Sequence, residues 1–161
     1  MQTTIIYITG IYDTLDLFTQ ELKNAFETMG YASFTYDARL EEESKQALIE
    51  CIEEGIKKGQ RFFGVTFNNL GYNLTLPEAK TETGDACSKQ NMGYSPKDIN
   101  SSREPNLWET YEIPYINILM DHPFHYEKPL QNAPDTSVVL CTDRNHVRYI
   151  RRYFKNIRYT D

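Results

Sequence analysis

Short, almost wholly apolar segments alternate along this chain with longer segments whose apolar residues recur every three or four positions. The short segments are rich in β-branched and aromatic residues, as strands buried on both faces of a sheet are. They lie at 4–9, 32–37, 61–67, 114–120 and 137–141. Regular alternation of such strands with helices is typical of a parallel sheet, because each parallel connection crosses the sheet before the next strand begins.

The segments between the strands have the signals of amphipathic helices. Apolar residues recur at helical spacing over 14–29, and Asp13 is the expected N-cap. Residues 41–58 begin with three glutamates and end with two lysines, an order that complements the helix dipole. A further helix follows the last strand, with Asp143 or Thr142 as its expected cap.

These patterns predict one α/β domain over residues 1–161. We expect a Rossmann-like three-layer domain with a mainly parallel sheet of about five strands and helices on both faces. The three cysteines are far apart in the sequence, which favours free thiols. Residues 75–106 are polar and lack periodicity, so we expect a surface insertion there, with a substrate lid as the alternative.

Composition excludes several classes of function. The chain has 17 basic and 23 acidic residues and a net charge of −6, which is the wrong sign for a general nucleic-acid binder. No apolar run approaches the roughly 20 residues that span a bilayer, and the N-terminus lacks signal-peptide features. We therefore expect a cytoplasmic protein without a membrane span. The H-x-x-H spacing of His122 and His125 is one that a metal site can have, but Pro123 between them disfavours a helix that presents both, and no further Cys or His is nearby, so we expect no metal. The glycine pattern of dinucleotide-binding turns is absent, and we expect no cofactor.

Ligands of open parallel sheets bind beyond the carboxyl ends of the strands, so the residues that follow each strand are candidate site residues. Gly10 and Tyr12 follow the first strand, and Asn68 and Asn69 follow the third. The turn at Gly10 is suited to meet a phosphate through backbone N–H groups, although it lacks the glycine pattern of dinucleotide-binding turns. An ordinary tight turn is the alternative.

All three histidines follow the fourth and fifth strands, together with other polar side chains. The group consists of Asp121, His122, His125, Tyr126, Asp143, Arg144 and His146. Histidine changes charge near neutral pH, and an adjacent aspartate can orient it, so Asp121 and His122 are candidate catalytic residues. The structural alternative is that Asp121 caps the turn while His122 bonds to the backbone. We expect the two turns to open side by side onto one concavity.

The last helix and the tail combine basic residues with interleaved tyrosines. These residues are Arg144, Arg148, Tyr149, Arg151, Arg152, Tyr153, Lys155, Arg158 and Tyr159. Such a mixture can contact phosphates and stack on bases. On an acidic protein, however, a solvated helix face is favoured, with a docking surface for another domain as the second reading.

Two segments carry a resemblance to a known family. Residues 113–124 (IPYINILMDHPF) resemble the "iPyi…vDhP" stretch of bacterial GT-B glycosyltransferases of the spore-maturation-protein type. Residues 139–149 (VLCTDRNHVRY) are similar to a strand–helix segment of the same family. Residues 64–68 lie where that family has a strand ending in a polar turn. The match covers mainly 61–73 and 107–158.

The resemblance implies the N-terminal, acceptor-side half of a two-domain enzyme that moves a sugar from a nucleotide-sugar to an acceptor. Asp121 or His122 would deprotonate the acceptor hydroxyl. The substrate-binding residues would be Gly10, Tyr12, Asn68, Asn69, His125, Tyr126, Asp143 and Arg144. Without the donor-binding half, we expect this chain alone to be weak or inactive. A stand-alone flavodoxin-like, ligand-sensing or docking module without catalysis is the alternative.

Overall fold

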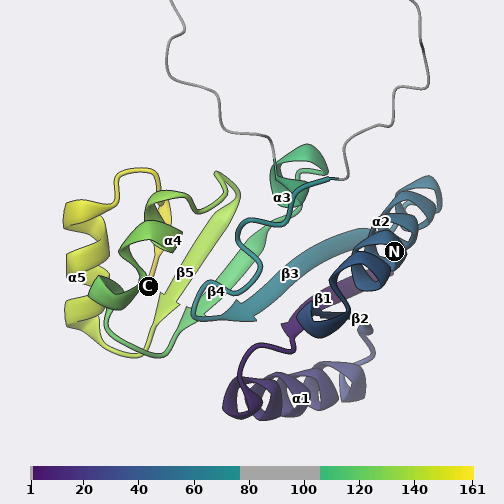
Figure 1. Cartoon of the computed structure of the whole chain (residues 1–161), viewed down its shortest axis with the longest axis horizontal. Helices are drawn as coiled ribbons and strands as arrows, with labels where there is room; N and C mark the ends of the chain where they lie inside the picture. The colour runs from purple at the N-terminus through teal and green to yellow at the C-terminus, as the bar shows by residue number, and fades with distance from the viewer. Residues whose placement is uncertain (1, 77–105) are drawn as a thin grey trace, which may run out of the picture.

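The computed structural model describes residues 2–76 and 106–161. Its six strands form one all-parallel sheet in the order β2-β1-β3-β4-β5-β6 (Figure 1). The strands are β1 (Thr3–Thr9), β2 (Ala32–Asp37), β3 (Arg61–Phe67), β4 (Tyr115–Leu119), β5 (Ser137–Cys141) and β6 (Tyr159–Thr160). The predicted Rossmann-like α/β fold is confirmed, and the sheet has one strand more than the five that the sequence indicated.

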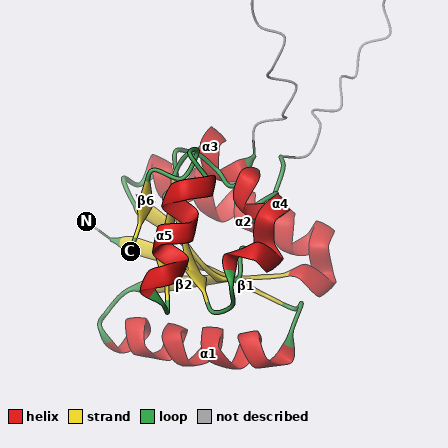
Figure 2. Cartoon of the chain, turned by 90° about the vertical axis from the view of Figure 1, so that its left-hand side faces the viewer, coloured by secondary structure: helices red, strands yellow, loops and turns green. Residues whose placement is uncertain are grey.

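Helices connect the strands and cover the sheet. They are α1 (Asp13–Thr28), α2 (Glu41–Lys57), α3 (Leu107–Thr110), α4 (Glu127–Gln131) and α5 (Arg144–Tyr153), with short 3-10 helices η1 (Ala38–Leu40) and η2 (Pro123–Tyr126). Among the described helices, α1 lies on one side of the sheet and the rest lie on the other (Figure 2). Right-handed crossovers explain this division. The connection from β1 to β2 runs toward one side of the sheet, whereas every later connection runs toward the other side, so its helix must cover the opposite face.

The core is built from alternate residues of each strand. On the α1 face, Tyr7 of β1 packs with Leu22 and Phe26. On the other face, Ile6 packs in the cluster that contains Ile52 of α2. A separate cluster fixes α4 and α5 over β4 and β5, and it consists of Leu119, Leu130, Ala133, Val139, Ile150, Phe154 and Ile157. This packing holds the carboxyl ends of the strands at one edge.

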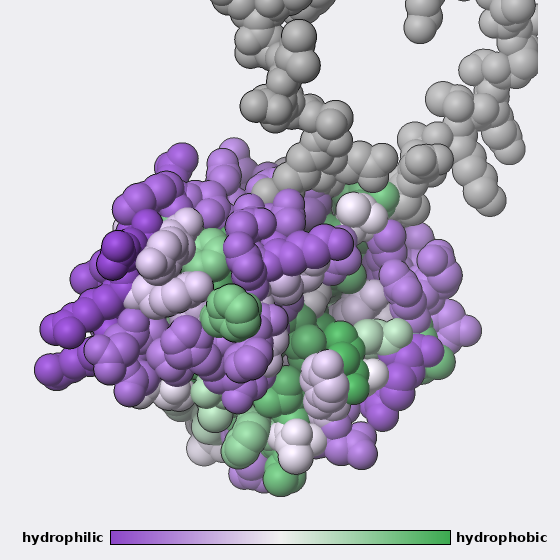
Figure 3. Space-filling view, turned by 60° about the vertical axis from the view of Figure 1, so that its left-hand side comes forward, coloured by the Kyte–Doolittle hydropathy of each residue, from purple (hydrophilic) through white to green (hydrophobic). Residues whose placement is uncertain are grey.

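One part of the sheet has no helix over it among the described residues. Because α5 shares a face with α2, the α1 face of β4, β5 and β6 is left partly open. The side chains there are apolar or aromatic: Ile116, Ile118, Val138, Leu140 and Tyr159. Leu140 is 38% exposed and Tyr159 is 65% exposed. Figure 3 shows hydrophobic side chains gathered low in the centre of the view, beside a hydrophilic left-hand part.

The helix starts only partly follow the sequence prediction. Asp143 caps α5 as expected, since its Oδ1 accepts from the Asn145 N–H at 2.6 Å. The prediction for α1 was wrong, because Asp13 is the first helical residue and Tyr12 is the N-cap, without a side-chain cap. Within the described residues, no helix is long and apolar enough to cross a membrane.

The predicted insertion at 75–106 lies outside the described residues except at its two ends. Thr75 and Asn106 form an antiparallel bridge, and the Leu107 N–H donates to the Leu74 carbonyl at 2.7 Å. Asn106 is buried, and its Oδ1 accepts from the Glu109 N–H at 3.0 Å to cap α3. The two described ends of this segment are therefore held side by side.

Candidate functional site

Two side chains meet the carboxylate of Asp121 at the carboxyl ends of the strands, one from the segment after β3 and one from the segment after β4. Asn68, directly after β3, donates from Nδ2 to Asp121 Oδ2 at 3.0 Å. The Tyr126 hydroxyl, on η2, donates to the same oxygen at 2.9 Å. Both bonds use Oδ2, and within the described chain no hydrogen bond is made to Oδ1. Asp121 is exposed, so Oδ1 is open to solvent, while the two bonds to Oδ2 hold the carboxylate in place.

Backbone geometry after β3 fixes Asn68 in this role. Asn68 and Asn69 have φ angles of +50° and +62°, a left-handed conformation that asparagine tolerates better than most residues. Asn68 also accepts from the Met120 N–H through Oδ1 at 2.9 Å, so its amide joins the ends of β3 and β4. Strained backbone of this kind is found preferentially at functional sites.

Asn69 points away from this edge. It is 2% exposed, and its N–H donates to Asn117 Oδ1 at 2.8 Å. Its own side-chain Oδ1 and Nδ2 are buried without a hydrogen-bond partner among the described residues. The side chain of Asn69 therefore does not reach the surface where Asp121 lies, and the residue contributes to the site through the turn it forms.

Tyr126 is held as a neutral donor. Burial, the hydrogen bond to Asp121 and the charge of that carboxylate together raise the pKa of Tyr126 to about 12. Tyr12, the N-cap of α1, is a minor further cause of the raised pKa of Tyr126. Tyr12 is 59% exposed. The hydrogen-bonded cluster combines residues that follow β3 and β4.

His122 acts as a cap. Its Nδ1 accepts from the Phe124 N–H at 3.1 Å, so the neutral ring carries its proton on Nε2. Of the structural alternative stated above, the backbone bond of His122 is therefore present, and His122, rather than Asp121, caps the turn. A ring whose Nδ1 is occupied in this way is suited to donate a hydrogen bond from Nε2 rather than to accept a proton there.

The turn after β4 lies beside the start of α5. The ring of His122 contacts that of His146 at a centroid distance of 4.9 Å and that of Tyr149 at 5.2 Å. His125 is exposed and packs against Phe124, with centroids 6.1 Å apart. Two of the three imidazoles are thus brought together. Asp143 and Arg144 are exposed at the N-terminus of α5, on the same side of the sheet.

The turn at Gly10 is filled by a carboxylate of the chain itself. The Gly10 N–H donates to both oxygens of Asp16, at 2.9 and 3.1 Å. The Arg39 guanidinium lies between two carboxylates, with Nη2 3.8 Å from Asp16 Oδ2 and Nε 2.9 Å from Asp37 Oδ1. Its hydrogen bonds to Asp37 hold the pKa of that carboxyl below its usual range. The position where a phosphate would meet this turn is therefore occupied by an internal anion.

Sequence reasoning missed Asp16, Asp37 and Arg39 as parts of this edge. The available signal was an aspartate at the end of the second strand, followed two residues later by arginine. No group of three or more potential metal ligands occurs in the ranges 2–76 and 106–161.

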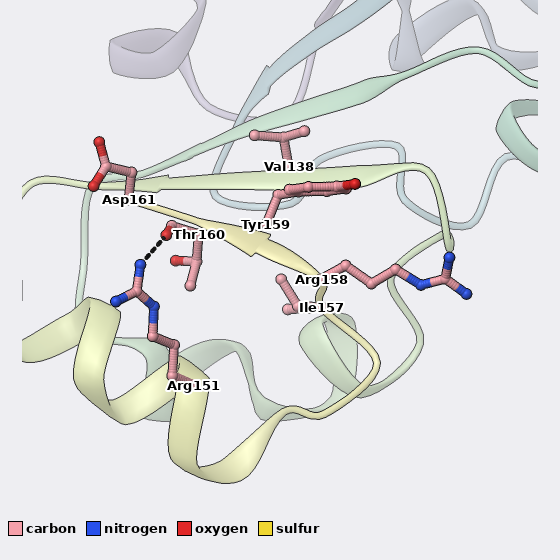
Figure 4. Close-up of a pocket in the computed structure, with 7 residues that line it drawn as sticks. All are labelled: Val138, Arg151, Ile157, Arg158, Tyr159, Thr160 and Asp161. Carbon is pink, nitrogen blue, oxygen red and sulfur yellow. Dashed lines mark hydrogen bonds between the residues drawn. The ribbon is translucent and has the colours of Figure 1, made fainter.

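A cavity of about 310 Å³ lies along β6, the last strand of the sheet, and none of the Asp121 cluster lines it (Figure 4). Val138 and Tyr159 are on one side of the sheet there, while Arg151 approaches from the other side. The Arg151 guanidinium donates to the Thr160 carbonyl at 2.8 Å. This bond occupies an outward-facing carbonyl of the edge strand, which protects the edge from pairing with another strand.

Comparisons of this chain with family models, with curated proteins and with solved structures found no match.

Proposed function

We propose that this chain is the acceptor-side half of a two-domain glycosyltransferase of the GT-B type, which moves a sugar from a nucleotide-sugar to an acceptor hydroxyl. The resemblance of residues 113–124 and 139–149 to that family supports the proposal. The observation that carries it is the carboxylate of Asp121, exposed at the carboxyl edge of a parallel sheet and fixed by Asn68 and Tyr126.

Asp121 is the base in this proposal. Its Oδ1 takes the proton of the acceptor hydroxyl as the hydroxyl oxygen attacks the anomeric carbon of the donor sugar. The bond from that carbon to the nucleotide phosphate breaks, and the nucleotide leaves with the electron pair. Fixing Oδ2 with two donors orients Oδ1 before the substrate arrives, which is how positioned groups lower a barrier.

His122 is a positioning residue in the same scheme. Its Nδ1 is engaged by the Phe124 N–H, so the Nε2–H is the group available to an acceptor oxygen. Tyr12, His125 and Arg144 are exposed on the segments that follow β1, β4 and β5, and in this proposal they complete the acceptor surface.

The test supplies the chain with a donor-binding half and measures sugar transfer from a nucleotide-sugar to a panel of acceptors. Asp121→Asn is expected to lower kcat by about 10²–10⁴-fold, the usual contribution of a general base. Asp135→Asn is the matched control, because Asp135 is an exposed carboxylate between α4 and β5. Unchanged transfer in Asp121→Asn, or an equal loss in both variants, refutes the assignment.

A second matched pair tests whether Tyr126 orients Asp121. Tyr126→Phe removes the hydroxyl that donates to Asp121. Tyr111→Phe removes a hydroxyl that also donates to a carboxylate, that of Glu53 on α2, at 3.1 Å and away from the candidate site. We expect about a tenfold loss of kcat in Tyr126→Phe, with KM less affected, and no loss in Tyr111→Phe. Equal kcat values in the two variants contradict an orienting role.

A flavodoxin-like ligand-binding module is the second candidate, because the order β2-β1-β3-β4-β5 is that of flavodoxins, whose flavin binds at the β1/β3 crevice. The bonds from the Gly10 N–H to Asp16 count against a bound phosphate there. Purified protein that carries the visible absorption of a flavin, and loses it in Gly10→Val, would favour this candidate over the transferase.

A further inference from the structure

The segment from Arg144 to Arg158 has a charge unlike the rest of the chain. It contains six basic residues and no acidic one, which leaves 11 basic and 23 acidic residues elsewhere. The protein is therefore strongly polarised, with its positive charge concentrated on α5 and the turn that follows. Charge asymmetry of this degree points to a charged partner rather than to fold stability.

The geometry of α5 arranges these charges in a row. Ile150 and Phe154 are buried against the sheet, while Arg144, Arg148 and Arg152 are exposed and four residues apart. Residues at this spacing lie one above another on a helix, so these three form an arginine row of about 12 Å. Arg151 and Lys155 are exposed close by.

The arginine row is not neutralised within the protein. None of its members forms an ion pair with any described residue. Arg152 lies over the ring of Tyr153, 5.3 Å from its centroid. Like charges four residues apart on a helix repel each other, and a cation at the first helical residue opposes the dipole. The row thus costs stability, and intramolecular packing does not explain it.

The row begins beside the candidate site. Arg144 is the first residue of α5, directly after Asp143. His146 and Tyr149, on the same helix, contact the ring of His122. The end of a chain-like ligand bound along the row at Arg144 would therefore reach the carboxyl ends of the strands, where the turn that carries Asp121 and His122 also lies.

We propose that the arginine row binds an anionic glycan, which under the proposed function is the acceptor of the sugar. Carboxylate or phosphate groups repeated along such a chain are the natural partners of a row of guanidinium groups, because arginine binds both bidentately. The glycan would place its terminal hydroxyl at Asp121 while its charges are held along α5. That the glycan is the acceptor rests on the proposed function, whereas binding of the glycan to the arginine row does not.

Other polyanions fit the row less well. Single-stranded nucleic acids need free aromatic faces for their bases. Here Tyr149 is engaged by His122 and by Tyr153, with the Tyr149–Tyr153 centroids 4.6 Å apart, and Arg152 lies over Tyr153. A flat anionic membrane would also meet the acidic remainder of the molecule, whereas a flexible chain follows one helix face.

The test measures binding of oligogalacturonate, a carboxylated glycan, to this chain, with its neutral methyl ester as the control ligand. We expect binding of the carboxylated form only, with an affinity that falls as salt rises. Arg148→Glu is expected to weaken binding about tenfold or more. Arg61→Glu, the same change at the exposed start of β3, is expected to change it by less than about twofold.

Folding of the variant is checked by its thermal midpoint. Arg148→Glu converts two repulsive pairs, with Arg144 and with Arg152, into attractive ones, so the midpoint should be unchanged or higher while binding falls. A lost affinity that accompanies a lowered midpoint contradicts this expectation. In that case Arg148→Gln, which removes the charge without reversing it, repeats the comparison, and undiminished glycan binding by this variant overturns the inference.

Several outcomes overturn the inference. These are no binding of oligogalacturonate, equal losses in Arg148→Glu and Arg61→Glu, or tighter binding of polyuridylate or phosphatidylglycerol vesicles that Arg148→Glu abolishes. Asp121→Asn and Arg148→Glu separate the two proposals, because the first should lower kcat for transfer by about 10²–10⁴-fold while the second should weaken oligogalacturonate binding whether or not transfer occurs. If transfer is never found while Arg148-dependent binding is, the proposed function fails and the glycan surface stands.

Discussion

The Tyr126 hydroxyl donates a 2.9 Å hydrogen bond to Asp121 Oδ2, which ties the end of β4 to η2. Burial is the largest cause that raises the pKa of Tyr126 to about 12, and the bonded carboxylate adds to it. The phenol therefore remains a hydrogen-bond donor at pH values well below 12. This pair is the part of the candidate site that a titration can examine directly.

Asp121→Asn is expected to lower the pKa of Tyr126 toward the ordinary tyrosine value of about 10 without reaching it, because the charge disappears and the burial remains. An ultraviolet titration of tyrosinate, with Tyr126→Phe subtracted to isolate this residue, measures the change. Asp135→Asn should leave the same titration where it is. An unaltered Tyr126 titration in Asp121→Asn means that the bond is not formed in solution.

The turn after β1 predicts a difference between two glycines. Gly10 and Gly30 both have a φ of +90°, so alanine is strained at each by about 1–2 kcal/mol. A Cβ at Gly10 would lie 2.2 Å from Asp37 Oδ1, whereas nothing lies within 4 Å of one at Gly30. Gly10→Ala should therefore lose about 1–3 kcal/mol more of unfolding free energy than Gly30→Ala.

Urea unfolding of the two glycine variants measures this difference. The result also reports on Asp37, whose Oδ1 accepts from the Arg39 N–H at 2.9 Å. Equal destabilisation of both variants would mean that the Asp37 carboxylate moves aside freely, and that the internal anion network at this turn is loose.

The open face of the sheet predicts a contrast between two leucines on neighbouring strands. Leu119 of β4 is fully buried under α4 and α5, and Leu140 of β5 is 38% exposed on the α1 face. Leu119→Ala should cost about 3 kcal/mol of unfolding free energy, as buried leucines do. Leu140→Ala should cost less than about 1 kcal/mol. Similar losses in both variants would show that the open face is covered in solution.

Most of the fold was predictable because buried parallel strands have a strong signature. The segments 4–9, 32–37 and 61–67 coincide with β1, β2 and β3 to within a residue, since each is bounded by polar or turn residues. Strand β6 was missed because it is only two residues long, Tyr159 and Thr160, which is too short to show a strand pattern. That miss also hid the position of α5, because its crossover to β6 places it on the face that α2 covers.

The candidate site was predictable only as a set of strand ends. The rule that ligands lie beyond carboxyl ends selected Asn68, Asp121 and Tyr126, which the structure brings into contact. The same rule does not say which way a side chain points, and Asn69 turned inward. The Asp16 bond to the Gly10 N–H depends on the angle at which α1 leaves β1, which periodicity does not encode.

Two buried tyrosines on different strands should differ in how much unfolding free energy is lost when the hydroxyl is removed. Tyr7 of β1 is buried, and its hydroxyl has no partner among the described residues, so Tyr7→Phe should leave the unfolding free energy unchanged or raise it by up to about 1 kcal/mol. The Tyr115 hydroxyl donates to the Leu70 carbonyl at 2.6 Å, so Tyr115→Phe should cost about 1–2 kcal/mol. Urea unfolding at neutral pH compares the two, and a larger loss in Tyr7→Phe would contradict the assignment.

The same Tyr7 variant has an alkaline signature. Burial, and secondarily the charge of Glu27, raise the pKa of Tyr7 to about 12, above the value of about 10 in the unfolded chain. The folded state therefore holds this proton more tightly, so its stabilisation is complete below pH 10 and is lost as the pH rises toward 12. Because Tyr7→Phe removes one such group, its unfolding free energy should fall less steeply over that interval than that of the native chain. Parallel curves would mean that the Tyr7 hydroxyl reaches solvent in the folded protein.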